Sequence, residues 1–277
     1  MRLRSLLFVP GDRPDRFAKA VASGADAIIL DLEDAVTQSA KARARDAVAK
    51  YLAGERPVPV LVRVNALGSG MTGEDLAAVL AGRPDGVVLP KAEGAASVEA
   101  LIAMMGHRSA PILPIATETP AAIFQLGTYG AVADRLLGLT WGAEDLPAAM
   151  GATTAREADG RYTPPYEMIR ALTLFGAHAA GVAAIDTVFP AIRDEAGLAA
   201  YVARARRDGF TGMMAVHPAQ VATINAGFTA TPDEIERARR IVNAFATQPG
   251  VGAVALDGQM IDAPHLKQAL RVLGASS

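Results

Sequence analysis

Two acidic residues, Glu118 and Asp145, follow consecutive short apolar runs of the chain, residues 112–116 and 136–140. If these runs are neighbouring parallel strands, their carboxyl ends bring the two carboxylates close together in space. Two carboxylates suit Mg²⁺, which prefers oxygen ligands and keeps positions for water and substrate oxygens, whereas zinc favours His or Cys. The alternative interpretation is that Glu118 and Asp145 cap the helices that follow them.

Arg63 is a charged residue in the otherwise apolar run 60–64. Burying a guanidinium without a partner is costly, so Arg63 needs an anion. One candidate is a substrate carboxylate held by two parallel hydrogen bonds. The other is a salt bridge to Glu33 or Asp34, and both interpretations are compatible.

Lys91 follows the apolar run 86–89 and has two possible roles. It could be the Schiff-base lysine of a class I aldolase, which attacks a carbonyl group as a free amine. The favoured interpretation is that Lys91 neutralises the acidic cluster, including Glu93.

Three other features favour structural roles. Residues 68–73 match the dinucleotide pattern G-x-G-x-x-G, but residues 65–67 separate them from the preceding strand, so a loop over the site is the better interpretation. His217, which precedes a proline, is expected to make structural hydrogen bonds. Trp141, the single tryptophan, is expected in the core or at the mouth of the site.

The elements that must position these residues alternate between predicted strands and predicted helices along the chain. Eight short apolar runs recur along the chain, at residues 5–9, 27–30, 60–64, 86–89, 112–116, 136–140, 184–188 and 212–216. Continuous apolar runs are typical of parallel strands buried on both faces. Helical patterns fill several of the intervals, at residues 15–23, 41–52, 74–80 and 97–105. The pattern predicts a (β/α)8 TIM barrel with its active site at the carboxyl ends of the strands.

The C-terminal region predicts a separate element. Residues 231–234 (TPDE) form a helix-start pattern with a capping Thr, a Pro and a Glu, ahead of apolar residues at helical spacing. A hairpin around Asp257 and Gly258 and a final helix from about Pro264 follow. We therefore expect a barrel domain over residues 1–230 and a helical extension over 231–277 that packs on the barrel or on a neighbouring subunit.

Composition excludes several classes of protein. The chain has 277 residues, 51% of them hydrophobic and 20% charged, which excludes a disordered chain. Its formal net charge of -2 gives no global positive field for nucleic acid or an anionic membrane, so neither is an expected partner. There is no cysteine, hence no disulfide and no thiolate chemistry. No signal peptide or spanning segment is recognised, and we expect a cytoplasmic protein.

Seven motifs, in order along nearly the whole chain, resemble the citrate lyase beta subunit and malyl-CoA lyase family of Mg²⁺-dependent lyases, whose members share an HpcH/HpaI aldolase-like barrel. They are residues 5–11 (SLLFVPG), 30–36 (LDLEDAV), 63–65 (RVN), 89–91 (LPK), 118–120 (ETP), 142–146 (GAEDL) and 217–218 (HP).

The resemblance implies roles for the acidic and basic residues at the strand ends. Glu118 and Asp145 match the family's metal-binding carboxylates. Arg63 matches the arginine that grips the keto-acid or hydroxy-acid carboxylate. Glu33 and Asp34 match acidic residues around that arginine and the metal-bound waters.

The same resemblance implies further roles away from the metal. Arg13, Lys19 and Lys41 resemble basic positions near the phosphates of coenzyme A. Residues 260–262 with 266–269 look like the C-terminal motif of malyl-CoA and citramalyl-CoA lyases, in which Asp262 enters a neighbouring subunit's active site as acid or base. A homo-oligomer, commonly a trimer in similar proteins, is therefore expected.

The expected activity is cleavage of a 3-hydroxy-acyl thioester. This reaction needs a base for the hydroxyl proton, a cation for the developing charge, and stabilisation of the thioester enolate. The resemblance favours malyl-CoA or citramalyl-CoA, cleaved to acetyl-CoA and a 2-keto acid. The alternatives are a citryl-carrier-protein lyase acting as the beta subunit of a citrate lyase complex, a malyl-CoA thioesterase, or a condensing enzyme.

Overall fold

The computed structural model describes residues 3–248 and 250–274, which form two compact units divided between Ala226 and Gly227. The sequence-based boundary lies after residue 230. Each unit has its own apolar core.

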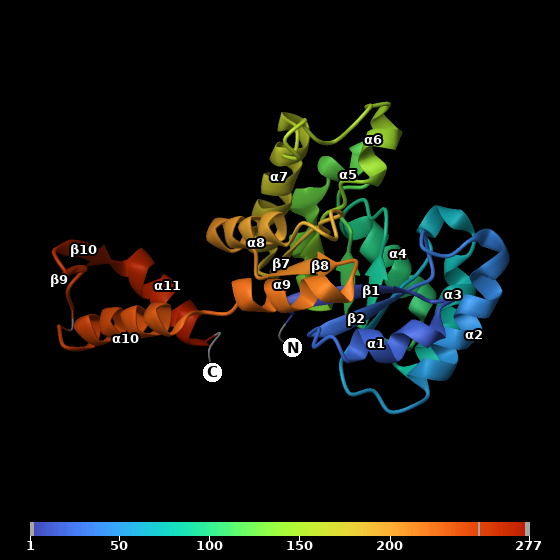
Figure 1. Cartoon of the computed structure of the whole chain (residues 1–277), viewed down its shortest axis with the longest axis horizontal. Coiled ribbons are helices and arrows are strands. Elements are labelled where there is room, and N and C mark those ends of the chain that lie inside the picture. The colour runs from blue at the N-terminus through green and yellow to red at the C-terminus, as the bar shows by residue number, and fades with distance from the viewer. Residues whose placement is uncertain (1–2, 249, 275–277) are drawn as a thin grey trace. The chain divides into compact units, whose positions relative to one another are not determined.

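The first unit is built on eight parallel strands, and each of the eight runs expected to be a strand forms one (Figure 1). They are β1 Ser5–Pro10, β2 Ala27–Asp31, β3 Val60–Arg63, β4 Gly86–Leu89, β5 Ile112–Pro114, β6 Gly138–Thr140, β7 Ala183–Asp186 and β8 Gly212–Ala215. The strand order is β5-β4-β3-β2-β1-β8-β7-β6. Isolated parallel bridges, Ile112 to Leu136 and Ile115 to Thr140, join the two end strands. The predicted (β/α)8 barrel is confirmed.

Burial on both faces explains why these strands are continuously apolar. Side chains of one set, including Leu6, Ile29 and Leu61, pack together in a shared core cluster. Their neighbours in sequence, such as Leu7 and Ile28, are also fully buried. In a barrel these alternate side chains point inward and outward, and the surrounding helices cover the outward set.

Helices surround the strands in the expected intervals (Figure 1). They are α1 Phe17–Val21, α2 Lys41–Leu52, α3 Thr72–Val79, α4 Ala95–Met105, α5 Pro120–Ile123, α6 Asp145–Met150, α7 Pro164–Ala180, α8 Glu195–Asp208 and α9 Val221–Gly227. The helix predicted over residues 15–23 is shorter than expected, because Pro14 opens a 3-10 turn, Pro14–Arg16, ahead of α1.

The second unit contains α10 Pro232–Ala246, β9 Ala253–Leu256, β10 Gln259–Asp262 and α11 Ala263–Gly274. The predicted capping box is confirmed: the Thr231 side chain accepts from the Glu234 N–H, and the Glu234 carboxylate accepts from the Thr231 N–H. The predicted hairpin is also confirmed, with Asp257 and Gly258 both at positive φ in the turn.

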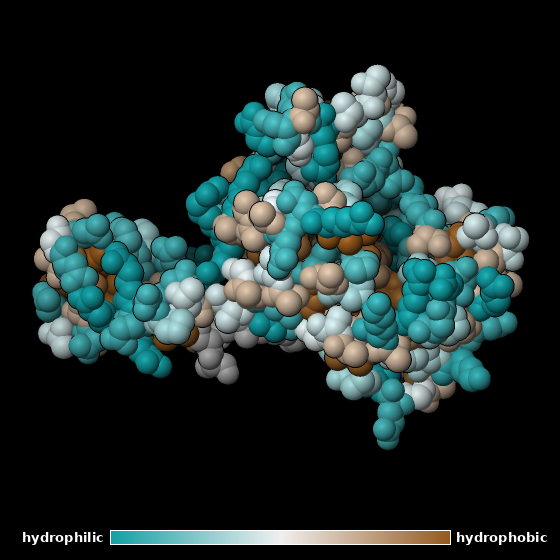
Figure 2. Space-filling view, viewed as in Figure 1, coloured by the Kyte–Doolittle hydropathy of each residue, from teal (hydrophilic) through white to brown (hydrophobic). Residues whose placement is uncertain are grey.

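The face of the molecule in Figure 2 carries apolar residues in small patches separated by hydrophilic ones. Within the described part of the chain, no helix has both the length and the apolar character needed to cross a membrane.

Candidate active site

A cluster of charged side chains gathers at the carboxyl ends of β2 to β6, where the barrel fold predicts the site. Its members are Asp31, Glu33, Asp34, Arg63, Lys91, Glu118 and Asp145. They line two cavities that share Asp34, one of about 350 Å³ beside Arg63, Glu118 and Asp145, and one of about 760 Å³ beside Glu33 and Lys91.

Arg63 is held by carboxylates on the neighbouring strand and the loop after it. Its Nε and Nη2 donate to the two carboxylate oxygens of Asp31 at 2.7 and 2.6 Å, and its Nη1 lies 3.0 Å from Glu33 Oε2. Burial opposes the charge on Arg63, but the Asp31 hydrogen bonds outweigh it and raise the pKa of Arg63. The expected salt bridge to Glu33 is confirmed, and Asp31 is the stronger partner that sequence reasoning did not assign. The guanidinium also lies over the Phe8 ring, 4.9 Å from its centroid.

Glu118 is a deeply buried carboxylate that accepts a hydrogen bond from the backbone of Lys91. The residue is only 4% exposed, and its Oε2 accepts a hydrogen bond from the Lys91 N–H at 2.6 Å. Burial, together with the negative charges of Asp145 and Glu33, raises the pKa of Glu118 to about 8. A cation beside Glu118 would offset this cost of burying the charge.

Gly142 makes room for the Glu118 side chain. A Cβ on Gly142 would lie 2.7 Å from Glu118 Cγ, which is closer than real Cβ contacts allow, and 3.0 Å from its Oε1. The glycine therefore belongs to the site for a steric reason, although sequence reasoning noted it only as part of a motif.

The helix-cap interpretation is wrong for Glu118. Thr119 caps α5, because its hydroxyl accepts from the Ala122 N–H. Asp145 is the first residue of α6, where the helix dipole favours a carboxylate, and its Oδ1 lies 3.3 Å from Lys91 Nζ.

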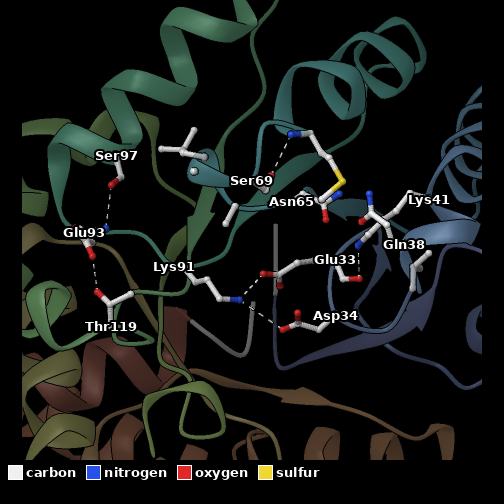
Figure 3. Close-up of a pocket in the computed structure, with 15 residues that line it drawn as sticks. Glu33, Asp34, Gln38, Lys41, Asn65, Ser69, Lys91, Glu93, Ser97 and Thr119 are labelled. Atoms are coloured by element: carbon white, nitrogen blue, oxygen red, sulfur yellow. Dashed lines mark hydrogen bonds and ion pairs between the residues drawn. The ribbon is translucent and has the colours of Figure 1, made fainter. Parts of the chain in front are cut away.

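The Lys91 ammonium lies near three carboxylates that come from two segments, the loop after β2 and the start of α6. Figure 3 shows its side chain extending from the loop after β4 towards Glu33 and Asp34. Its Nζ lies 2.6 Å from Glu33 Oε1 and 3.6 Å from Asp34 Oδ2, in addition to the contact with Asp145. Burial disfavours the ammonium, but the Glu33 hydrogen bond and the nearby carboxylates outweigh it and raise the pKa of Lys91.

A protonated Lys91 is poorly suited to Schiff-base chemistry, which needs the free amine. The favoured interpretation, a lysine that neutralises the acidic cluster, is confirmed. The prediction that Lys91 also neutralises Glu93 is wrong, because the Glu93 carboxylate accepts instead from the Thr119 hydroxyl at 2.6 Å (Figure 3).

The three basic residues expected near coenzyme A lie in different surroundings. Arg13 is exposed and paired with Asp15, and Lys19 is exposed on α1. Lys41 is buried, and its ammonium donates to the carbonyl oxygens of Leu32 and Glu33, both at 2.7 Å. Lys41 therefore fixes the backbone that carries Glu33, and the phosphate contacts of all three stay predictions.

Asp262 belongs to the second unit, at the end of β10, where its carboxylate pairs with His265. Its action in an active site stays a prediction.

His217 makes the structural hydrogen bond expected of it, accepting from the Ala219 N–H through Nδ1. Trp141 is fully buried, and its Nε1 donates to Asp186 at 2.6 Å.

Glu118 and Asp145 fit a magnesium ion by the chemistry of their side chains. Among residues 3–248 and 250–274, no three His, Asp or Glu side chains are grouped as metal ligands. Mg²⁺ needs only one or two carboxylates and completes its shell with water and substrate oxygens. Both carboxylates line the 350 Å³ cavity, which provides room for these additional ligands.

The HpcH/HpaI aldolase/citrate lyase family model matches residues 4–218, which include the whole charged cluster. The chain belongs to this family. A citrate lyase subunit beta-like protein of Mycobacterium tuberculosis is 38% identical to it over 268 residues, covering 96% of this chain and 93% of the relative. A (3S)-malyl-CoA thioesterase of Cereibacter sphaeroides is 35% identical over 280 residues, covering 98% and 93%.

A solved structure of a family member has the same fold along almost the whole length. It is CitE from Mycobacterium tuberculosis in complex with magnesium, acetoacetate and coenzyme A, with a TM-score of 0.85 and 36% identity. The match covers 99% of this chain and 98% of that one.

Proposed function

We propose that this family member is a Mg²⁺-dependent carbon-carbon lyase, which cleaves a malyl-CoA or citramalyl-CoA type thioester to acetyl-CoA and a 2-keto acid. The observation that carries the proposal is the buried Glu118 beside Asp145 and Arg63 in one cavity at the barrel mouth. The magnesium, acetoacetate and coenzyme A held by the CitE relative support the metal and the substrate class.

Glu118 and Asp145 would hold the metal, which supplies Lewis-acid stabilisation and a template for the substrate's hydroxyl and carboxylate oxygens when bound. Arg63 would neutralise the substrate carboxylate. Its Nε and one Nη2 hydrogen donate to Asp31, and its Nη1 pairs with Glu33 through charge without a hydrogen bond, so N–H groups are left for a substrate anion. Glu33 would keep the arginine oriented, and Asp34 would add negative charge to the same cavity.

Asp262 from a neighbouring subunit is proposed as the proton-transfer group, in a homotrimer. A base removes the hydroxyl proton, the carbon-carbon bond breaks to leave the keto acid, and the thioester enolate is protonated to acetyl-CoA. Arg13, Lys19 and Lys41 are proposed to lie near the coenzyme A phosphates, and a cytoplasmic location fits the coenzyme A substrate.

The test compares malyl-CoA, citramalyl-CoA and citryl-CoA as substrates, with and without EDTA, and follows free thiol and keto acid in parallel. Keto acid released without thiol, and lost on chelation, is the expected result. Release of neither product from any of the three thioesters would contradict the proposal.

A malyl-CoA thioesterase is the second candidate, because a relative 35% identical to this chain carries that name. A metal held by the same residues would serve either reaction, and only the placement of a water would differ. Thiol release without keto acid would establish this activity. A citrate lyase beta subunit is the third candidate, and activity only on a carrier-protein thioester would favour it.

A further inference from the structure

The carboxylates of the charged cluster fall into two sets: Asp31 and Glu33 pair closely with the cations Arg63 and Lys91, whereas Glu118 and Asp145 do not. Both oxygens of Glu33 face cations: Oε1 lies 2.6 Å from Lys91 Nζ and Oε2 lies 3.0 Å from Arg63 Nη1. Asp31 is likewise held by Arg63 through both oxygens. Glu118 instead accepts from a backbone N–H, and Asp145 has a longer contact with Lys91, at 3.3 Å.

Lys91 contacts both sets, through different atoms. Its backbone N–H donates to Glu118. Its ammonium holds Glu33, as Figure 3 shows. Lys91 has a φ of 50°, in the left-handed region that favours glycine. A lysine kept in this conformation at the centre of the cluster points to a role for its side chain.

We propose that Lys91 is a positioning residue that holds Glu33 away from the metal, which leaves Glu118 and Asp145 as the buried cluster's carboxylates that bind it. The inference rests on the proposed function for the metal site. Its consequence is selectivity, because Ca²⁺ takes six to eight oxygen ligands and gains from an added carboxylate, whereas Mg²⁺ keeps several waters.

The ratio of Ca²⁺ to Mg²⁺ affinity separates this role from simple electrostatics. Removing one positive charge strengthens the attraction of the site for both ions, since both carry the same charge. A third carboxylate ligand favours the larger ion and changes the ratio. Asp34 is the less suited third ligand, because it is 56% exposed and its contact with Lys91 is longer.

The experiment measures Mg²⁺ and Ca²⁺ binding to the full chain by calorimetry, without substrate, for wild type, Lys91→Met, Lys91→Arg and the double variant Lys91→Met/Glu33→Gln. We expect Lys91→Met to raise the ratio of Ca²⁺ to Mg²⁺ affinity roughly tenfold, the lower end of the affinity changes that follow from altering the outer partners of metal ligands. Lys91→Arg keeps the cation and should keep the ratio. The double variant also removes the Glu33 carboxylate, which can then no longer bind the metal, and should return the ratio to that of wild type.

A ratio unchanged in folded Lys91→Met, or a raised ratio that persists in the double variant, overturns the inference. Glu33→Gln alone gives a second test should Lys91→Met not fold: the ratio should stay that of wild type, and a fall would show that Glu33 already binds the metal. Wild type that binds no Mg²⁺ would instead contradict the proposed function. Circular dichroism and thermal unfolding establish that each variant is folded.

Discussion

Asp31 and Arg63 are register partners on the neighbouring strands β2 and β3, and the guanidinium contacts both oxygens of the carboxylate. Parallel pairing places these two residues side by side at the barrel mouth. The pair fixes the direction of Arg63, and the remaining N–H groups are available to a substrate anion. Asp31 also accepts from the backbone N–H groups of Glu33 and Ala35, so it shapes the loop that carries the acidic cluster.

Asp31→Asn should therefore cost both stability and activity. It leaves Arg63 buried with less compensating charge, and breaking a buried ion pair typically costs about 3 kcal/mol. Urea unfolding should show this loss in the free energy of unfolding, and the KM for the thioester should rise as Arg63 loses its orientation. The exposed pair Arg13 and Asp15 provides the control: Asp15→Asn should leave the free energy of unfolding unchanged. Equal stability of the two variants would contradict this account of Asp31.

Gly142→Ala should weaken metal binding and activity by displacing Glu118. The added methyl group would lie 2.7 Å from Glu118 Cγ, so the carboxylate must move. We expect at least a tenfold loss of Mg²⁺ affinity by calorimetry, in the range typical of displaced metal ligands and their supports. Gly127→Ala is the matched control, because a Cβ there meets nothing within 4 Å. Wild-type Mg²⁺ affinity in Gly142→Ala would show that Glu118 is not a ligand.

Removal of the metal should abolish turnover. EDTA is expected to stop keto-acid release, and Mg²⁺ added back should restore it. Glu118→Gln removes one of the two carboxylates proposed to hold the metal, so Mg²⁺ should no longer rescue the treated enzyme at concentrations that suffice for wild type. Glu93→Gln is a useful comparison, since Glu93 lies in the neighbouring loop and bonds to Thr119. Full turnover by EDTA-treated wild type would rule out a metal-dependent mechanism.

The barrel was predictable because each strand is a short apolar run, and burial on both faces leaves that pattern in the sequence. That Glu118 and Asp145 line one cavity was predictable for the same reason, since each follows such a run. The salt bridge of Arg63 to Glu33 was predictable as well, but its stronger partner Asp31 was not, because strand register decides that Asp31 lies beside Arg63. Lys91 was expected near Glu93, whereas its left-handed backbone and side-chain direction bring the ammonium to Glu33.

Asp262→Asn should lower turnover sharply while leaving substrate binding nearly intact, because the amide keeps the shape of the side chain but cannot accept the hydroxyl proton. The kcat should fall at least a hundredfold, the usual contribution of a general base, with little change in KM.

Mixing two variants tests whether Asp262 acts across subunits. Asp262→Asn and Glu118→Gln, each inactive alone, should regain part of the wild-type activity when unfolded and refolded together, because mixed oligomers pair an intact barrel site with an intact Asp262. No recovery in confirmed mixed oligomers would show that Asp262 does not serve a neighbouring subunit, and unchanged activity of Asp262→Asn would remove it from the mechanism.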